Sequence, residues 1–326
     1  MSLSVKYLGL DLKNPIIIGS SGLTNSVEKI INLEKFGAGA VVLKSLFEEQ
    51  ILREMGRSEN QDYNDYPEAH DYARYYTKEK SICDYLNLLE EAKGSVNIPV
   101  IASINCVDSK EWSSFAKKIE SSGADALEIN VSMLPSDIKV SSIDNEKKYF
   151  DIISEVRKNI KIPIALKMSS YSAGLAQLIQ KLSWTKNTDA FVLFNRYYSP
   201  DIDLDKMKIV SSNVLSSPAE ISVSLRWMAV LSNKIKLPLI ASTGIHNSEG
   251  VIKQILAGAQ AVQIVSTVYK NGNQYIGEII SGIEHWMNKN NYSSLADFRG
   301  LLSYDKAKEA ASFERIQFMK YYSNIN

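Results

Sequence analysis

The nine residues "NIPVIASIN" (Asn97–Asn105) carry the pattern from which the architecture of this chain follows. A proline opens a run of apolar and small residues, and an asparagine ends it. The same phrase returns as "KIPIALKMS" at residues 161–169 and as "KLPLIASTG" at residues 236–244. Strands that are apolar at nearly every position are typical of a parallel sheet buried between helices.

A second phrase alternates with the first, as "FGAGAVVLKS" (36–45), "SGADALEINVS" (122–132) and "AGAQAVQIVST" (257–267). In each copy a glycine ends a helix and an apolar strand follows. The six copies and two further apolar runs, at Pro15–Gly19 and Ala190–Phe194, predict eight strands. The other six are Ala40–Lys44, Pro99–Ile104, Ala126–Asn130, Pro163–Met168, Pro238–Ser242 and Ala261–Val265. Amphipathic segments predict helices between them, at Ser26–Phe36, Ser109–Ser121, Glu146–Asn159, Ala219–Ser232 and Ser248–Leu256.

Eight strand–helix units over about 250 residues are the signature of an α/β fold of the (β/α)8 TIM-barrel class. An inserted loop after the second strand accounts for part of the remaining length. The competing architecture is a doubly wound open sheet, but the Gly-x-Gly-x-x-Gly turn that usually accompanies it is absent. No low-complexity segment or Gly/Ser linker divides the chain, so residues 1–326 are predicted to form a single domain.

The composition narrows the class of function. A hydrophobic fraction of 45% and a charged fraction of 23% are typical of a soluble globular protein, and the net charge of zero favours neither nucleic acid nor an anionic membrane as partner. No apolar run approaches the roughly 20 residues of a membrane span, and the N-terminus does not have the pattern of a signal peptide. Cys83 and Cys106 form no metal-ligand pair, which indicates reduced thiols in a cytoplasmic protein.

Polar or small residues follow every predicted strand. Because all eight strand ends meet at one face of a barrel, these residues are expected to share a site. They are Gly19, Ser20, Ser21, Lys44, Ser45, Asn105, Asn130, Ser132, Lys167, Asn195, Arg196, Thr243, Gly244, Ser266 and Thr267.

Two lysines and three asparagines dominate this set, and it lacks the carboxylate cluster or histidine of a metal centre or a Ser/His/Asp hydrolase. Lysines at the ends of buried strands favour an anionic partner. The loops "STGIHNSEG" (242–250) and "VSTVYKNG" (265–272) place small residues before helix N-termini, where backbone N–H groups bind phosphate. His246 lies in the first loop and is expected to cap a helix or to face solvent. These features indicate redox chemistry with a phosphate-anchored cofactor and no bound metal.

These residues resemble the dihydroorotate dehydrogenase family of FMN-containing barrels, in its soluble class, from "NPIIIGSSG" (14–22) to "SLADFRG" (294–300). The resemblance implies that Asn130, Asn195 and Arg196 bind substrate and that Lys44 and Ser132 act in catalysis. It also implies that FMN is bound by Gly19, Ser20, Ser21, Lys44, Ser45, Asn105, Asn130, Lys167, Ser216, Ser217, Gly244, Ile245, Ser266 and Thr267.

The departures from the family pattern concern the substrate. The active-site base of the family, a cysteine in soluble members, falls on Met133, and a family asparagine falls on Pro135. The loop "NQDYNDYPEAHDYARYYTKEKS" (60–81) has no Gly-Leu-Pro-Asn. Proton transfer by a positioned side chain contributes about 100- to 10,000-fold in rate, and a thioether cannot perform it. Either another group, such as Cys106 or His70, transfers the proton, or the reaction differs from dihydroorotate oxidation.

Three functions are open at this point. The first is an FMN-dependent oxidoreductase that passes a hydride between a small cyclic CH–CH substrate and FMN, with a role in pyrimidine biosynthesis if that substrate is dihydroorotate. The second is a flavin-binding electron-transfer or sensor subunit without such turnover. The third is an aldolase-type barrel with a Schiff base on Lys44 or Lys167. No nucleic-acid or membrane partner is expected; a homodimer and a soluble redox partner remain open.

Overall fold

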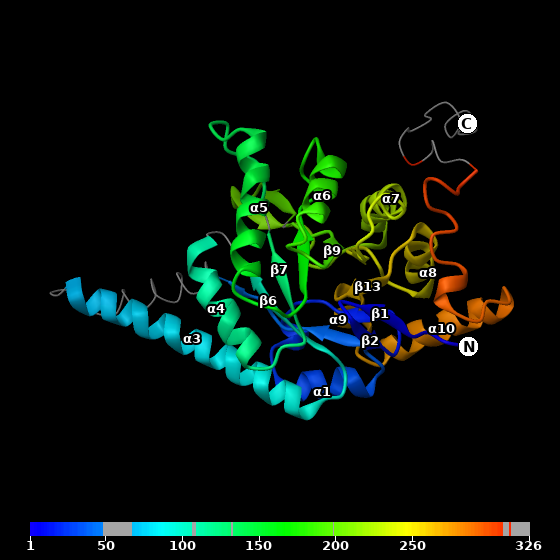
Figure 1. The fold of residues 1–326 in the computed structure, drawn as a ribbon, viewed down its shortest axis with the longest axis horizontal. Helices are drawn as coiled ribbons and strands as arrows, with labels where there is room; N and C mark the ends of the chain where they lie inside the picture. Colours follow the sequence, from blue (N-terminus) through cyan, green and yellow to red (C-terminus); the bar gives the residue numbers. More distant parts are fainter. Residues whose placement is uncertain (48–66, 106–108, 132, 198, 309–312, 314–326) are drawn as a thin grey trace.

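A closed barrel of eight parallel strands forms the centre of the computed structural model, which describes residues 1–47, 67–105, 109–131, 133–197, 199–308 and 313 (Figure 1). The barrel closes where β4 pairs with β6, and the short β5 (Leu46–Phe47) adds to the end of β6. In order around the barrel the strands are β3 (Ile16–Ile18), β4 (Ala40–Val42), β6 (Val100–Asn105), β7 (Ala126–Asn130), β8 (Ile164–Met168), β9 (Ala190–Leu193), β12 (Leu239–Ser242) and β13 (Ala261–Ile264). The predicted (β/α)8 barrel is confirmed.

Each of the eight predicted strands is present, and those introduced by proline begin one residue after it, at Ile16, Val100, Ile164 and Leu239. Proline has no N–H to donate to a sheet, so it stands just outside the paired residues. All six residues of β6 are buried, which agrees with a strand covered on both faces.

Helices surround the barrel (Figure 1). Several begin at a side-chain cap, as Ser26 does by accepting a hydrogen bond from the Lys29 N–H. Gly258 ends α8 with a left-handed φ of 118°, a conformation that glycine adopts without strain. The helices are α1 (Val27–Lys35), α3 (Pro67–Ser95), α4 (Ser109–Ser121), α5 (Ser142–Arg157), α6 (Leu175–Trp184), α7 (Ile221–Leu231), α8 (Ser248–Ala257), α9 (Ser266–Asn271) and α10 (Tyr275–Lys289), with 3-10 turns η1 (Gly22–Thr24), η2 (Pro218–Glu220) and η3 (Leu295–Asp297).

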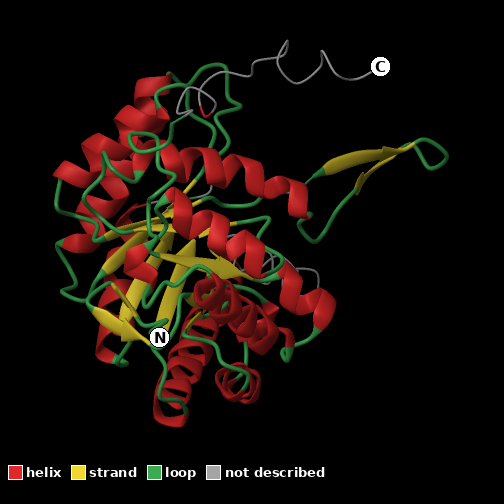
Figure 2. Cartoon of the chain, turned by 90° about the vertical axis from the view of Figure 1, so that its right-hand side faces the viewer, coloured by secondary structure: helices red, strands yellow, loops and turns green. Residues whose placement is uncertain are grey.

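Two segments differ from the expectations. The inserted loop after the second strand is, from Pro67 onward, the first part of the 29-residue helix α3, which extends beyond the barrel (Figure 1). Proline suits the first position of a helix, and neither glycine nor a second proline interrupts the segment until Gly94. A hairpin of β10 (Pro200–Asp203) and β11 (Lys208–Ser211), which was not predicted, projects from the body (Figure 2).

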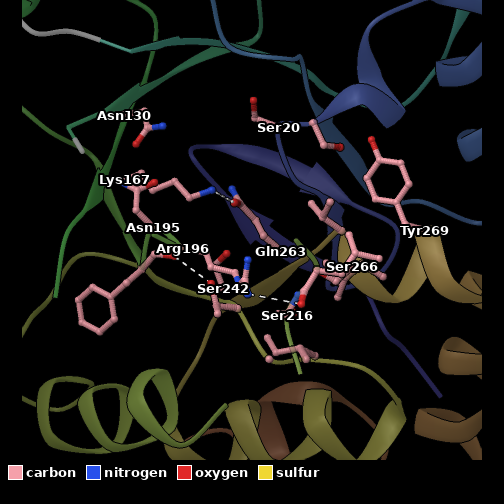
Figure 3. A pocket seen from close by; sticks show the side chains of 18 of the residues that line it. Ser20, Asn130, Lys167, Asn195, Arg196, Ser216, Ser242, Gln263, Ser266 and Tyr269 are labelled. Atoms are coloured by element: carbon pink, nitrogen blue, oxygen red, sulfur yellow. Dashed lines mark hydrogen bonds between the residues drawn. The ribbon is translucent and has the colours of Figure 1, made fainter. Parts of the chain in front are cut away.

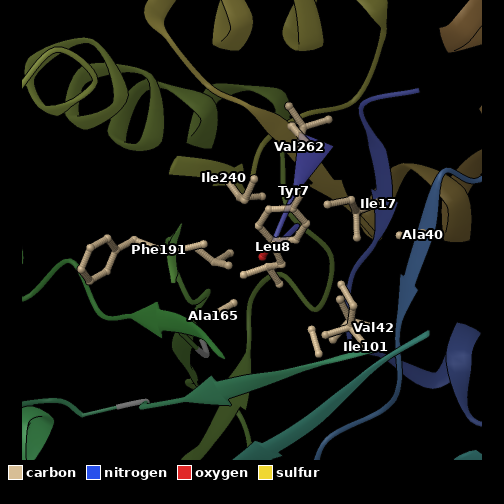
Figure 4. Close-up of a cluster of buried hydrophobic side chains, with 14 of the residues drawn as sticks. Tyr7, Leu8, Ile17, Ala40, Val42, Ile101, Ala165, Phe191, Ile240 and Val262 are labelled. Atoms are coloured by element: carbon tan, nitrogen blue, oxygen red, sulfur yellow. The ribbon is translucent and has the colours of Figure 1, made fainter. Parts of the chain in front are cut away.

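A second hairpin, β1 (Val5–Tyr7) and β2 (Leu10–Leu12), lies at the N-terminal part of the chain and supplies Tyr7 to the barrel core. The Tyr7 ring is 1% exposed and lies among Ile17, Ile240 and Val262 (Figure 4). Burial, and then the charge of Glu128, raise the pKa of the Tyr7 hydroxyl well above its usual value. Side chains of Tyr7 and its apolar neighbours thus pack inside the barrel, as the side chains of other barrels of this class do.

Of the helices that the structure describes, none combines the length and the hydropathy that a membrane span requires.

Candidate active site

A cavity of about 810 Å³ opens at the C-terminal ends of the barrel strands (Figure 3). Its size lies within the range of about 300–1,000 Å³ that is usual for cofactor and small-molecule sites. It is lined by Ser20, Ser21, Lys44, Ser45, Asn130, Lys167, Phe194, Asn195, Arg196, Val214, Leu215, Ser216, Ser242, Thr243, Gly244, Ile245, Gln263, Ile264, Val265, Ser266 and Tyr269.

Most of the predicted site residues therefore come together at this one cavity. Gly19, Asn105, Ser217 and Thr267 are not among the residues that line it. Ser132 lies outside the described residues, as do Cys106 and the side chain of His70. Met133 is half-buried and packs against the hydrophobic core instead of lining the cavity. The roles assigned to these residues stay predictions.

Hydroxyl groups connect the first three strands at the cavity edge. Ser45 Oγ is 2.9 Å from Ser20 Oγ and 2.7 Å from Ser103 Oγ, and the Ser45 N–H donates to Ser20 Oγ at 2.8 Å. Behind them the Tyr85 hydroxyl donates to the Ser103 carbonyl at 3.0 Å and accepts from the Ser103 N–H at 2.7 Å. Burial raises the pKa of Tyr85, which keeps this hydroxyl protonated. The backbone beside Lys44 is thus held in one arrangement.

The floor of the cavity contains a charged pair that the sequence patterns did not reveal. Lys167 Nζ donates to Gln263 Oε1 at 2.8 Å and lies 3.4 Å from Glu128 Oε1 (Figure 3 shows the Lys167–Gln263 bond). The Gln263 amide donates in turn to Glu128 Oε2. Glu128 and Gln263 are polar residues inside otherwise apolar strands, a sequence signal that could have identified them.

One wall of the cavity offers an unpaired acceptor. Asn130 Oδ1 is buried and has no hydrogen-bond partner among the described residues. Asn195, on the neighbouring wall, donates a long hydrogen bond of 3.5 Å from Nδ2 to the Val131 carbonyl (Figure 3). A buried acceptor without a donor is costly, so the Asn130 amide suits a ligand that carries an N–H group.

The opposite end of the cavity is built from tight turns. Thr243 and Gly244 are consecutive residues with positive φ, of 76° and 77°. A Cβ on Gly244 would stand 2.1 Å from the Ile221 backbone nitrogen, so only glycine fits between β12 and the start of α7. This close approach brings the loop after β12 against the segment that carries Ser216.

His246 takes part in this end of the site and does not cap a helix; the cap of α8 is Asn247. His246 Nε2 lies 3.0 Å from Ser216 Oγ, and Lys270 Nζ donates to the Ser216 carbonyl at 2.8 Å. Desolvation, and then the positive charge of Lys270, lower the pKa of His246. The Ser216 N–H donates to Ser266 Oγ at 3.0 Å, so three loops meet here.

Arg196 holds the segment that follows the projecting hairpin. Its guanidinium donates to the carbonyl oxygens of Asn213 and Val214, both at 2.9 Å, and to that of Leu215 at 3.4 Å. Its Nε donates to Glu220 Oε1 at 3.2 Å. With these partners the side chain shapes the cavity wall, and a direct contact with substrate stays a prediction.

Replacing Arg196 by methionine is expected to weaken FMN binding about tenfold and to lower the free energy of unfolding by about 2 kcal/mol, because three carbonyls and a carboxylate lose a charged donor. Arg157 is a matched control: it bonds the carbonyls of residues 160–162 and Asp189, before β9, away from the cavity. Arg157→Met should cost similar stability but leave FMN binding unchanged. Urea unfolding and fluorescence titration measure both; equal loss of FMN affinity in the two variants would contradict the assignment.

The residues of the cavity fit a flat heterocycle that carries a phosphate. The unpaired Asn130 amide oxygen would accept from a ring N–H, Lys167 would supply a cation, and the loops around Gly244 and Ser266 would supply backbone and hydroxyl donors to a phosphate. Within the described residues no three His, Cys, Asp or Glu side chains gather where they could bind a metal ion.

Comparison with known proteins identifies the family. The family model for dihydroorotate dehydrogenase matches residues 60–287, which is more than half of the chain. The chain is also similar to proteins described as the catalytic subunit of dihydroorotate dehydrogenase B (NAD(+)). In Thermoplasma volcanium the identity is 26%, over 92% of this chain and 98% of the relative. In Methanocaldococcus jannaschii it is 25%, over 89% and 94%, and in Pyrococcus furiosus 27%, over 92% and 99%. The chain therefore belongs to the dihydroorotate dehydrogenase family, whose members are oxidoreductases that use FMN and act on CH–CH bonds.

Proposed function

We propose that the cavity holds FMN and that this chain passes a hydride between the CH–CH bond of a small cyclic substrate and that cofactor. The observation that carries the proposal is the unpaired amide oxygen of Asn130 in the same cavity as Lys167 and the Gly244 turn. An N–H acceptor and a cation suit the flavin ring of FMN, and a turn that offers backbone N–H groups suits its phosphate. An aldolase or an electron-transfer subunit without turnover is not favoured, because the relatives are dehydrogenase subunits.

The protein's own residues have separable tasks in this proposal. Bound FMN supplies the capacity to accept a hydride. Lys167 offers positive charge at the cavity floor, and the turns at Gly244 and Ser266 anchor the phosphate. Asn130 and Asn195 orient the ring of the substrate, and Lys44, which follows β4, lines the same cavity.

The substrate is proposed to be a small ring compound whose oxidation does not depend on a proton acceptor at position 133. Met133 packs against the core with a side chain that neither gives nor takes a proton. Dihydroorotate, the compound named for the relatives, is therefore expected to react slowly with this protein.

The electrons are proposed to leave through a second subunit. The relatives are named as catalytic subunits of an enzyme that uses NAD(+), and that name implies a further subunit in those enzymes. We propose the same division of labour here, with the whole chain acting as one catalytic domain in a soluble complex.

Anaerobic mixing of the FMN-loaded protein with dihydroorotate tests the proposal. The protein is expected to bind FMN and to show the visible absorbance of oxidised flavin, which dithionite bleaches at once and dihydroorotate bleaches slowly. A protein that stays colourless after incubation with FMN would refute the cofactor site. Rapid bleaching by dihydroorotate would leave the cofactor site intact but refute the proposed substrate.

A further inference from the structure

The side chains of Lys167, Gln263 and Glu128 form a closed ring on the cavity floor. Lys167 and Gln263 line the cavity, whereas Glu128 lies beneath them and is 1% exposed. Lys167 Nζ donates to Gln263 Oε1 at 2.8 Å, and Gln263 Nε2 donates to Glu128 Oε2. The other oxygen of the carboxylate, Glu128 Oε1, lies 3.4 Å from Lys167 Nζ and completes the ring. The ring joins strands β7, β8 and β13.

The hydrogen bonds of this ring fix the orientation of the Gln263 amide and of the Lys167 ammonium. The Gln263 amide has a donor on its oxygen side and a carboxylate on its nitrogen side, so a rotation of the amide by half a turn would lose both bonds. Of the three N–H donors of the Lys167 ammonium, one goes to Gln263 among the described residues, and the ammonium also faces the cavity. Glu128 thereby determines which donors the floor presents.

Glu128 is a buried acidic residue in a part of β7 that is otherwise apolar from Ala126 to Ile129. Its neighbours Ala126, Leu127 and Ile129 are buried and apolar, and an apolar side chain at 128 would avoid the cost of burying a carboxylate. Glu128 Oε1 has no hydrogen bond among the described residues, so Lys167 is the cation that compensates this carboxylate in that part of the chain. A group retained at such a cost points to a task at the site.

We propose that Glu128 is a positioning residue for the cofactor, which orients Lys167 and Gln263 under FMN and sets how strongly the cavity prefers reduced over oxidised FMN. The inference rests on the proposed location of FMN in this cavity. Reduced FMN carries more negative charge, and Lys167 stabilises it. The Glu128 carboxylate, 3.4 Å behind Lys167 Nζ, offsets part of that stabilisation and keeps the preference moderate.

Glu128→Gln is the principal test, because it removes the charge and keeps the shape. In the FMN-loaded protein this variant is expected to raise the ratio of affinities for reduced over oxidised FMN about tenfold, as one unit charge removed near a partly buried site would. That factor corresponds to a midpoint potential about 30 mV more positive. Potentiometric titration monitored by flavin absorbance measures it without any substrate.

Asp125→Asn is the matched control, because Asp125 stands at the other end of β7. Its carboxylate pairs with Lys93 Nζ at 2.7 Å and accepts from the Val100 N–H at 2.7 Å. This variant should lose thermal stability and leave the potential of FMN unchanged. A potential that stays constant in Glu128→Gln, or moves equally in both variants, would overturn the role of Glu128.

Two further outcomes are distinguishable. If wild-type protein fails to bind FMN, the proposed function fails, and the role of Glu128 fails with it. If Glu128→Gln does not yield folded protein, Glu128→Asp takes its place, since it keeps the charge but withdraws it from the ring. The aspartate variant is expected to move the potential in the same direction by a smaller factor, and an unchanged potential would again overturn the inference.

Discussion

Replacing Met133 by cysteine is expected to raise the rate at which dihydroorotate bleaches the bound flavin by about 100-fold. By the resemblance to the family, Met133 is predicted to fall at the position of the proton acceptor, and a positioned acceptor contributes on the order of 100-fold or more. The side chain is half-buried near the end of β7, where a smaller thiol can be accommodated. Anaerobic stopped-flow absorbance measures the rate.

The control for this experiment is Met133→Ala, which opens the same space without supplying an acceptor. A cysteine variant that is faster than the alanine variant assigns the gain to proton transfer. If both variants react at the same rate, residue 133 is not the position of the proton acceptor, and another group accepts the proton from the substrate. The ratio of the cysteine to the alanine rate should also rise with pH, because the thiolate and not the thiol accepts the proton.

Replacing Gly244 by alanine is expected to lower the free energy of unfolding by about 3 kcal/mol and to weaken FMN binding more than tenfold. The added methyl would stand 2.1 Å from the Ile221 nitrogen and 2.6 Å from the Glu220 carbonyl carbon, and backbone atoms cannot move aside as a flexible side chain does. The positive φ of 77° adds a penalty of about 1 kcal/mol. Relief of the clash would displace the loop that lines the cavity.

The Gly9→Ala variant separates the cost of the steric clash from the cost of the positive φ. Gly9 has nearly the same φ, 75°, but no atom lies within 4 Å of the place that an added methyl would take, and the residue is far from the cavity. The free energy of unfolding of the Gly9→Ala variant should fall by only about 1 kcal/mol, and the variant should bind FMN as the wild-type protein does. Urea unfolding and FMN titration of both variants make the comparison; similar values for the two would show that the close approach at Gly244 is relieved at little cost.

The eight strands were predictable because each is a local pattern. A proline or a glycine precedes most of these short apolar runs. Because the strands are buried on both faces, their sequences do not alternate between apolar and polar residues as a surface strand does. The helical nature of residues 67–81 was missed because the comparison with the family's substrate loop outweighed the helix-forming composition of the segment. The projecting hairpin was missed because its exposed strands lack a buried face.

The cavity lining was predictable in large part, because parallel barrel strands bring all their C-terminal ends to one face. The partners of individual side chains were not. Arg196 donates hydrogen bonds to carbonyl oxygens 17 to 19 residues further along the chain, and His246 hydrogen-bonds Ser216, which is 30 residues away in the sequence. These contacts depend on how the loops fold over the barrel mouth, and no local spacing encodes that path.

The amino-acid sequence by itself determined the barrel, the face that carries the site and the family, since these follow from short apolar runs and from which residue types end them. Only the tertiary structure decided that Glu128 lies beneath Lys167 and Gln263. Gln263 is 96 residues from Lys167 and 135 from Glu128 along the chain. Closure of the barrel brings these three side chains within contact distance. Strands that are remote in sequence become part of one barrel, and their inward-facing side chains point toward its axis.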